Sequence, residues 1–292
     1  MSDYVIISDA TLDLPLDIME QHKIHVIPMT FTLNDVSYTH FPDEREITIE
    51  AFYKALTEGG LSQSSQIPPI IYQEFMEEFL KQGKDIYYIA FSSGLSGTYN
   101  SGRMVMENLK EKYPNQKLLC SDTLCASIGE GLLVLTAARK KEEGLSIEEL
   151  QQWVNKHRSN FMHWFTVKDL FYLKRGGRLS SLEALVGTAL KIRPVLTTDD
   201  EGKLVVFSKL RGSKKELEFL VNALETQAIT PATQTIIIGH SDNLEQAKAL
   251  EQLIKEKNIV KEIIISQIGP IIGTHTGPGM LALTFYGEKP AN

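Results

Sequence analysis

Residues 85–100 read Asp-Ile-Tyr-Tyr-Ile-Ala-Phe-Ser-Ser-Gly-Leu-Ser-Gly-Thr-Tyr-Asn and contain the join between a strand and a helix. Apolar and aromatic residues run without interruption from Ile86 to Phe91, which is typical of a buried strand. The two glycines that follow predict a turn, and a helix is expected over residues 98–112. Several hydroxyls therefore lie beside the free N–H groups of a helix N-terminus, which suits an anionic or carbonyl oxygen.

This hydroxyl-rich turn does not match the usual phosphate-binding or hydrolase patterns. No Gly-Lys-Ser/Thr follows it, as a P-loop requires, and its serines lack the G-x-S-x-G spacing of a hydrolase nucleophile. A helix N-cap at Ser96 or Thr98 explains one of its hydroxyls but leaves the others unexplained. We therefore predict a ligand site here, formed by Ser92, Ser93, Gly94, Ser96 and Gly97.

Strands and helices alternate on both sides of this turn, which predicts a doubly wound parallel sheet. The expected strands are residues 4–8, 26–33, 85–91 and 117–120, and the expected helices are residues 14–22, 48–58, 71–82, 98–112, 126–142 and 147–158. Asp9 follows the first strand, so it is expected at the same end of the sheet as the Ser93 turn and supports the site. Asp13 is interpreted as a turn or capping residue.

The pattern changes after about residue 160 and predicts an α+β second half with a mainly antiparallel sheet. Strands are expected at residues 164–167, 195–198, 203–209, 235–240 and 261–268, and helices at residues 182–190, 214–224 and 244–257. Residues 195–209 turn at Asp199-Asp200-Glu201-Gly202 and read as a β-hairpin. The predicted domains are residues 1–160, a parallel α/β domain, and residues 161–292, an α+β domain, with the ligand between them.

Residues 268–279 form a glycine-rich stretch, interpreted as a loop, in which His275 stands between Thr274 and Thr276. A histidine there can donate to a carboxylate or a phosphate, and it titrates near neutral pH. A purely structural histidine is the alternative. The hydroxyls and glycines around it favour a functional role. None of the other histidines has a metal-ligand spacing, so no metal site is predicted.

The charge distribution limits the classes of partner. The net charge of −7 argues against a nucleic-acid binder, which needs a surplus of Lys and Arg. Between Lys168 and Lys215, however, eleven Lys or Arg stand against five acidic residues. This segment is either a specific anionic contact, transient contact with a membrane surface included, or a solvated face. With no export signal and no membrane span in the sequence, we expect a cytoplasmic protein.

Taken together, these segments resemble the DegV family, whose bacterial members include the fatty-acid-binding FakB subunits of fatty acid kinase. The resemblance runs nearly end to end. It rests on residues 8–15 (Ser-Asp-x-Thr-x-Asp-Leu-Pro), 92–99 (Ser-Ser-Gly-Leu-Ser-Gly-Thr-Tyr), 173–178 (Leu-Lys-Arg-Gly-Gly-Arg) and 268–279 (Ile-Gly-Pro-x-Ile-Gly-Thr-His-Thr-Gly-Pro-Gly). Asp122-Thr123 with Ala126-Ser127-x-Gly129 also looks like a family segment.

The resemblance implies a protein that buries a long-chain fatty acid between its two domains and needs no other cofactor. Such a protein has no catalytic activity alone. It presents the carboxyl group to an ATP-dependent kinase subunit related to dihydroxyacetone kinases, and the acyl phosphate product serves phospholipid synthesis. By resemblance, Ser93, His275 and Thr274 bind the carboxyl group. Arg211, with Arg175 and Arg178 as further candidates, contacts the kinase or its phosphate.

One segment departs from the family pattern. The family's Thr-Ser-Gln-Pro-Ser is replaced here by Ser64-Ser65-Gln66-Ile67-Pro68, so Ser64 is assigned the role of its threonine and Ser65 supports the turn. Hydroxyls and one imidazole can hold a carboxylate while leaving an oxygen free to attack a γ-phosphate. Two alternatives stay open: a sensor that binds another small molecule, and a hydrolase in which His275 activates Ser93.

Overall fold

The computed structural model describes residues 4–179 and 192–289, so the predicted helix at 182–190 lies outside the described residues. A four-stranded parallel sheet has the order β2-β1-β6-β7, formed by Ile24–Ile27, Tyr4–Asp9, Asp85–Ala90 and Leu118–Asp122. All residues of β1 and β6 are buried, as expected for strands with helices on both faces. The predicted parallel sheet is confirmed.

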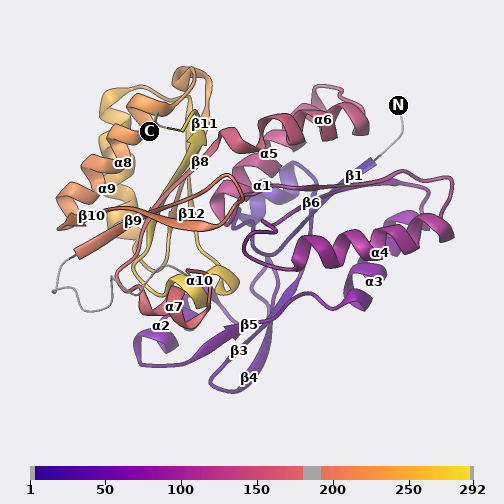
Figure 1. Cartoon of the computed structure of the whole chain (residues 1–292), viewed down its shortest axis with the longest axis horizontal. Coiled ribbons are helices and arrows are strands. Elements are labelled where there is room, and N and C mark those ends of the chain that lie inside the picture. Colours follow the sequence, from indigo (N-terminus) through magenta and orange to yellow (C-terminus); the bar gives the residue numbers. More distant parts are fainter. Residues whose placement is uncertain (1–3, 180–191, 290–292) are drawn as a thin grey trace.

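Helices cover both faces of this sheet (Figure 1). They are α1 (Leu16–Gln21), α3 (Pro69–Leu80), α4 (Thr98–Lys112), α5 (Ile128–Glu142) and α6 (Ile147–His157). The helix α2 (Ile49–Thr57) instead packs against α10 (Pro270–Thr276). Alternate strand residues serve the two faces: Ile6 and Tyr87 pack in one core with α5 and α6, and Ile7 and Tyr88 pack in another with α3 and α4. The sheet is therefore doubly wound.

The second half contains a six-stranded sheet of order β10-β9-β8-β13-β11-β12. Its strands are Leu204–Arg211, Ile192–Thr198, Phe161–Thr166, Leu281–Tyr286, Thr235–His240 and Glu262–Gln267. The predicted hairpin is confirmed as the antiparallel pair β9 and β10, and only the neighbours β11 and β12 run parallel within this sheet. The helices α8 (Ser213–Gln227) and α9 (Leu244–Lys257) cover its outer face (Figure 1).

A third sheet corrects the prediction of one strand over residues 26–33. Pro28 separates β2 from β3 (Met29–Leu33), which leaves the parallel sheet and pairs antiparallel with β4 (Val36–His40) and β5 (Ser62–Ser64). A proline has no N–H to donate, so it divides a run that otherwise reads as one strand. The polar loop around Ser64 therefore contains a short strand.

The glycine-rich stretch around His275 is a helix, α10 (Pro270–Thr276), which corrects the loop interpretation. Pro270 occupies the first turn, where its missing N–H costs nothing, and Gly277 ends the helix with a φ of +68°. Residues 281–286 (β13), 171–175 (α7) and 36–40 (β4) also have regular structure that the sequence reading did not predict.

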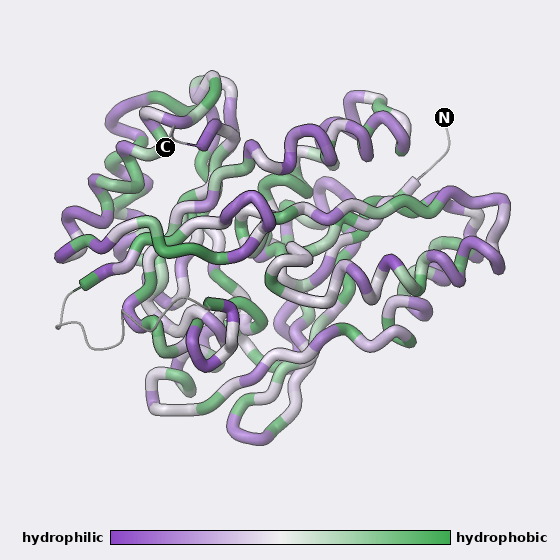
Figure 2. The backbone as a smooth tube through the Cα atoms, viewed as in Figure 1, coloured by the Kyte–Doolittle hydropathy of each residue, from purple (hydrophilic) through white to green (hydrophobic). Residues whose placement is uncertain are grey.

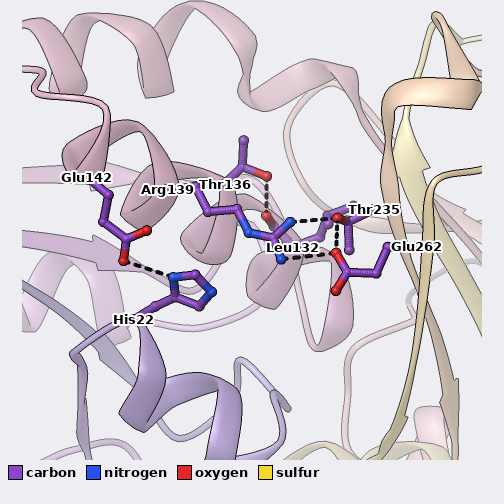
Figure 3. A network of polar contacts seen from close by, with 7 residues as sticks. All are labelled: His22, Leu132, Thr136, Arg139, Glu142, Thr235 and Glu262. Atoms are coloured by element: carbon purple, nitrogen blue, oxygen red, sulfur yellow. Dashed lines mark hydrogen bonds and ion pairs between the residues drawn. The ribbon is translucent and has the colours of Figure 1, made fainter.

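Helix α5 joins the two large sheets. It packs against β2 on one side and against β8, β11 and β13 on the other. Its residues 128–135 are all buried, so this part of the helix is enclosed on every side, as expected for a helix inside a protein. Figure 3 shows its polar end: Arg139 donates to Thr235 (2.6 Å) and Glu262 (3.0 Å), and Glu142 pairs with His22 (2.9 Å). The division into domains 1–160 and 161–292 remains a prediction, since α5 belongs to the packing of both sheets.

Hydropathy follows the layers. The strands are mainly hydrophobic, whereas the outer helices α4, α8 and α9 contain many hydrophilic residues (Figure 2). Within the described ranges, none of the helices has both the length and the apolar composition that crossing a bilayer requires.

Candidate functional site

A cavity of about 960 Å³, counting the open space at its mouth, lies between the carboxyl ends of the parallel strands and the inner face of the six-stranded sheet. Thr11 beyond β1, Phe91 beyond β6 and Ala126 beyond β7 form one wall. The remaining lining residues are Met29, Ser64, Ser65, Gln66, Leu95, Ser96, Thr98, Ser127, Ile128, His163, Trp164, Phe165, Leu173, Arg178, Thr198, Leu204, Ile271, Ile272, His275, Thr276, Met280, Ala282, Leu283 and Thr284. This is the position at which open α/β sheets bind ligands, and most of the surface inside it is apolar.

The mouth of the cavity contains a serine and histidine pair. The Oγ of Ser64 on β5 and the Nε2 of His275 on α10 lie 2.8 Å apart, although the two residues are 211 positions apart in the chain. Burial, and then the positive charges of Arg178 and Arg175, lower the pKa of His275 to about 4. The imidazole is therefore neutral at pH 7 and presents one N–H donor and one acceptor.

Ser96 and Thr98 face the cavity from the start of α4. Their hydroxyl oxygens are 2.9 Å apart, and the N–H of Thr98 donates to the Oγ of Ser96. Gly97 lies against the side chain of Gln66, since a Cβ on Gly97 would be 2.4 Å from the Gln66 side-chain nitrogen. The turn after β6 and the segment after β5 can thus approach closely, bringing Ser96 and Ser64 to the same cavity.

Ser93, the serine that we had assigned to the carboxyl group, is exposed and does not line the cavity. Its N–H donates to the Oδ1 of Asp122 (3.1 Å). Ser92 is buried and donates to the Gly202 carbonyl (2.9 Å) in the β9–β10 hairpin. The serine of this turn that faces the cavity is therefore Ser96.

Thr274 also lies away from the cavity. Its hydroxyl is buried, 2.6 Å from the Oγ of Ser62, and donates to the Pro270 carbonyl at 2.8 Å. Thr274 therefore attaches α10 to β5, the strand that carries Ser64, and so sets the position of His275. Ser65 is exposed beside the cavity, where its N–H donates to the Thr30 carbonyl (3.0 Å).

The three predicted arginines occupy different environments. Arg178 lines the cavity, and its guanidinium donates to the carbonyls of Leu95 and Gly176. Arg175 is exposed and lies over the ring of Tyr172, and Arg211 is exposed at the end of β10. Neither Arg175 nor Arg211 lines the cavity.

Comparison with known proteins agrees with this architecture. Residues 3–288 match the family model described as "Uncharacterised protein, DegV family". The chain belongs to the DegV family. It is 43% identical over 288 residues to a DegV domain-containing protein of Clostridium perfringens, covering 99% of each chain, and 34% identical to one of Streptococcus pyogenes, covering 98% of this chain and 99% of that one.

Solved DegV structures share the fold. A DegV protein of Thermus thermophilus, described as showing fatty acid binding, has a TM-score of 0.88 at 28% identity and covers 98% of this chain and 100% of that one. The DegV protein of Bacillus subtilis, described as a fatty acid binding protein, has a TM-score of 0.85 at 29% identity and covers 99% of this chain and 100% of that one.

Beneath the cavity of this DegV chain lies a buried acidic network that sequence reasoning missed, apart from Asp9. The Thr11 hydroxyl lies 2.5 Å from Asp9 Oδ1 and 2.8 Å from Glu130 Oε2. One hydroxyl has a single hydrogen, so two carboxylates around it require that one of them be protonated. Asp9 also accepts hydrogen bonds from Tyr88 and from the N–H of Phe91 (both 3.2 Å), which favours its charged form.

Glu130 is therefore the protonated partner. Its pKa is raised well above its ordinary value, first by burial and then by the charge of Asp9. The network joins β1, the end of β6 and α5, and it holds Thr11 at the cavity wall. In the described part of the chain, no group of three or more His, Cys, Asp or Glu side chains is arranged to hold a metal ion.

Asp13 makes a second buried junction. Its carboxylate accepts from Ser127 Oγ (2.6 Å) and from the N–H of Gly269 (2.8 Å), and its carbonyl accepts from Ser266 Oγ. Burial raises the pKa of Asp13 to about 7. Asp13 has a φ of +46° and lies between the turn after β1 and the N-cap Pro15 of α1, so it is neither the turn residue nor the cap of that helix that we expected. Its contacts with β12 and α10 depend on segments more than 250 residues away.

Proposed function

We propose that this chain binds a long-chain fatty acid, with the carboxyl group at Ser64, His275 and Ser96 and the acyl chain in the apolar cavity. The observation that supports this proposal is the Ser64–His275 pair at the edge of a mostly apolar cavity. Ser65 and Gln66 beside it are exposed, whereas the opposite wall at Thr284 is fully buried. The polar pair thus marks the end that solvent and a partner protein can reach.

The energetics favour this orientation. Burial of apolar surface contributes roughly 0.8 kcal/mol per CH₂, so a chain of about sixteen carbons gains on the order of 10 kcal/mol before the cost of association. The neutral hydroxyls and imidazole contribute direction more than affinity. The Arg178 guanidinium already donates to two carbonyls, so it adds positive charge without clamping the carboxylate through all its donors.

The proposal includes a partner. A carboxylate held by neutral donors keeps an oxygen available for phosphorylation, so we propose that the chain presents its fatty acid to an ATP-dependent, dihydroxyacetone-kinase-like subunit that makes acyl phosphate for phospholipid synthesis. The chain itself would be a cytoplasmic binding subunit without enzymatic activity or another cofactor. Arg175 and Arg211 are exposed and outside the cavity, which suits contact with the kinase or its phosphate.

Nothing in the geometry favours a hydrolase. Ser93 does not line the cavity, and the serine beside His275 is Ser64. Among the described residues, the Nδ1 of His275 has no hydrogen-bond partner, so no carboxylate orients the ring as a catalytic base requires. A histidine with a pKa of about 4 is also a weak base at pH 7.

Extraction of lipid from the purified protein, followed by mass spectrometry, tests the binding proposal. We expect about one fatty acid per chain. Protein that contains no fatty acid and also fails to bind added oleic acid in a calorimeter would exclude fatty acid binding.

The kinase proposal is tested with Arg211→Ala, for which we expect normal lipid binding but slower acyl phosphate formation. Equal loss of both would contradict the separate roles of cavity and surface.

A further inference from the structure

The inner face of the six-stranded sheet presents side chains to the cavity in rows that cross three strands. Phe165 on β8 pairs with Ala282 on β13 and with Leu196 on β9, which makes an apolar row. Two residues further along, His163 pairs with Thr284, and the same register places Thr198 opposite His163. Because side chains alternate between faces with a period of two, this second row, Thr198–His163–Thr284, faces the cavity as well.

The second row is polar, and two of its polar atoms lack partners. Thr284 is 0% exposed, and among the described residues its Oγ1 makes no hydrogen bond. Among the described residues the Nδ1 of His163 likewise makes no hydrogen bond, although the neighbouring Phe161 backbone favours the protonated ring. A buried hydroxyl without a partner costs free energy, so a polar row at the end of an apolar cavity needs an explanation.

The ring nitrogens of His163 have distinct roles. Its Nε2 accepts from the N–H of Ala126 at 3.4 Å, so the proton of the neutral ring is on Nδ1. Burial lowers the pKa of His163 to about 4, which keeps the ring neutral at pH 7. The row therefore offers a ligand the N–H of His163 on β8 as a donor. On the adjacent strand β13 it offers the hydroxyl of Thr284, which acts as donor or acceptor.

We propose that this buried row, beyond the apolar middle of the cavity, recognises an oxygen substituent on the acyl chain, so that the preferred ligands are hydroxylated fatty acids. The ligand's hydroxyl would accept from His163 Nδ1–H and donate to Thr284 Oγ1. The inference rests on the proposed function, since it assumes an acyl chain that extends from Ser64 and His275 towards the sheet. It adds a substrate class, because a fatty acid with a wholly apolar tail would leave the polar atoms of this row without hydrogen-bond partners.

Calorimetric binding of octadecanoic acid and of a positional series of hydroxyoctadecanoic acids to delipidated protein tests this inference. We expect one positional isomer to bind the native chain about fivefold more tightly for each hydrogen bond gained. In Thr284→Val, which removes the hydroxyl with little change of shape, that preference disappears and the unsubstituted acid binds at least as well as before. Thr197→Val on β9 is the matched control, since Thr197 does not line the cavity.

The outcomes separate this inference from the proposed function. If octadecanoic acid binds and every hydroxylated isomer binds equally or more weakly, the row holds water and the inference is overturned, while fatty acid binding stands. If no acyl chain binds, the proposed function itself fails. Should Thr284→Val not fold, the comparison of ligands on the native chain still decides, and Thr284→Ser, which keeps the hydroxyl, is expected to retain the preference.

Discussion

At the scale of single residues, a difference of three positions decides which serine faces the cavity. In the turn after β6, Ser93 is exposed and does not line the cavity, whereas Ser96 does. Both serines belong to the same short run of hydroxyls and glycines, and nothing in their spacing tells them apart. The orientation depends on the close approach of Gly94 to the backbone of Glu201 and on the hydrogen bond from Ser92 to the Gly202 carbonyl.

The two serines make a matched pair of variants. We expect Ser96→Ala to lower acyl phosphate formation by the paired kinase about tenfold, because a misplaced carboxylate reacts more slowly. Ser93→Ala is expected to leave the rate within about twofold, since its hydroxyl is in solvent. The measurement is the initial rate at saturating fatty acid. A larger loss of rate in Ser93→Ala than in Ser96→Ala would show that Ser93, and not Ser96, positions the carboxyl group.

The buried acid Glu130 gives a prediction about pH. Its pKa is raised in the folded state, so the folded protein retains a proton that the unfolded chain loses above about pH 4.5. The free energy of unfolding therefore falls as the pH rises above that value, by at most about 1.4 kcal/mol per pH unit for this group. Urea denaturation between pH 5 and pH 8 measures this slope.

Glu130→Gln removes the titration while keeping a side chain of similar shape with a donor for Thr11. We expect the variant to gain stability relative to the native chain as the pH rises, with the difference smallest near pH 5. Glu143→Gln, at the exposed end of the same helix, is the control and should follow the native slope. Parallel slopes for native protein and Glu130→Gln would mean that another group carries the proton.

At the scale of elements, close backbone approaches join segments that are distant in the chain. The turn after β6 touches the β9–β10 hairpin at Gly94, where a Cβ would lie 2.4 Å from the Glu201 carbonyl oxygen. Helix α10 is joined to β5 by Thr274 and Ser62, and to Asp13 by the N–H of Gly269. These contacts position the cavity wall, although none of them is visible in local sequence patterns.

Gly94→Ala tests the approach of the turn to the hairpin. The added methyl group meets backbone atoms, which cannot rotate away, so we expect a loss of about 1–3 kcal/mol in the free energy of unfolding. Urea denaturation measures the loss, and Ser93→Ala in the same turn should change stability by less than about 0.5 kcal/mol. An unchanged stability of Gly94→Ala would show that the hairpin is free to move away.

At the scale of the whole molecule, the cavity lies between two sheets that α5 packs against, so a ligand there stabilises the folded arrangement of both. At a free concentration one hundred times the Kd, a ligand adds about 2.7 kcal/mol, which raises Tm by about 4 °C for a chain of this size. We expect oleic acid to produce this rise in delipidated protein.

Ala282→Phe fills the middle of the cavity with an aromatic ring, since Ala282 lies in the apolar row of the far wall. We expect this variant to fold, to contain no extractable fatty acid and to show no rise in Tm with oleic acid. Ala282→Val, with a smaller increase in volume, should bind a shorter chain in preference. A normal response in Ala282→Phe would place the acyl chain elsewhere.

The sequence by itself determined the layers of the fold. Uninterrupted apolar runs such as residues 86–91 specify buried parallel strands, and the hairpin signal at residues 199–202 specifies antiparallel pairing, because these preferences depend on neighbouring residues alone. It also indicated the segments that bear Ser64 and His275, through the resemblance of their motifs. The division of residues 26–33 at Pro28 was missed because the β-branched and aromatic residues on both sides of the proline all favour a strand.

Only the tertiary structure decided which side chains face the cavity. Ser64 and His275 meet across 211 residues, and Thr284 meets His163 through a register between strands that the chain connects only at a distance. Such contacts depend on the orientation of whole elements, which follows from the burial of both faces of α5 and from glycines that allow close approach. Local sequence specifies what each segment is, whereas packing between distant segments specifies what it touches.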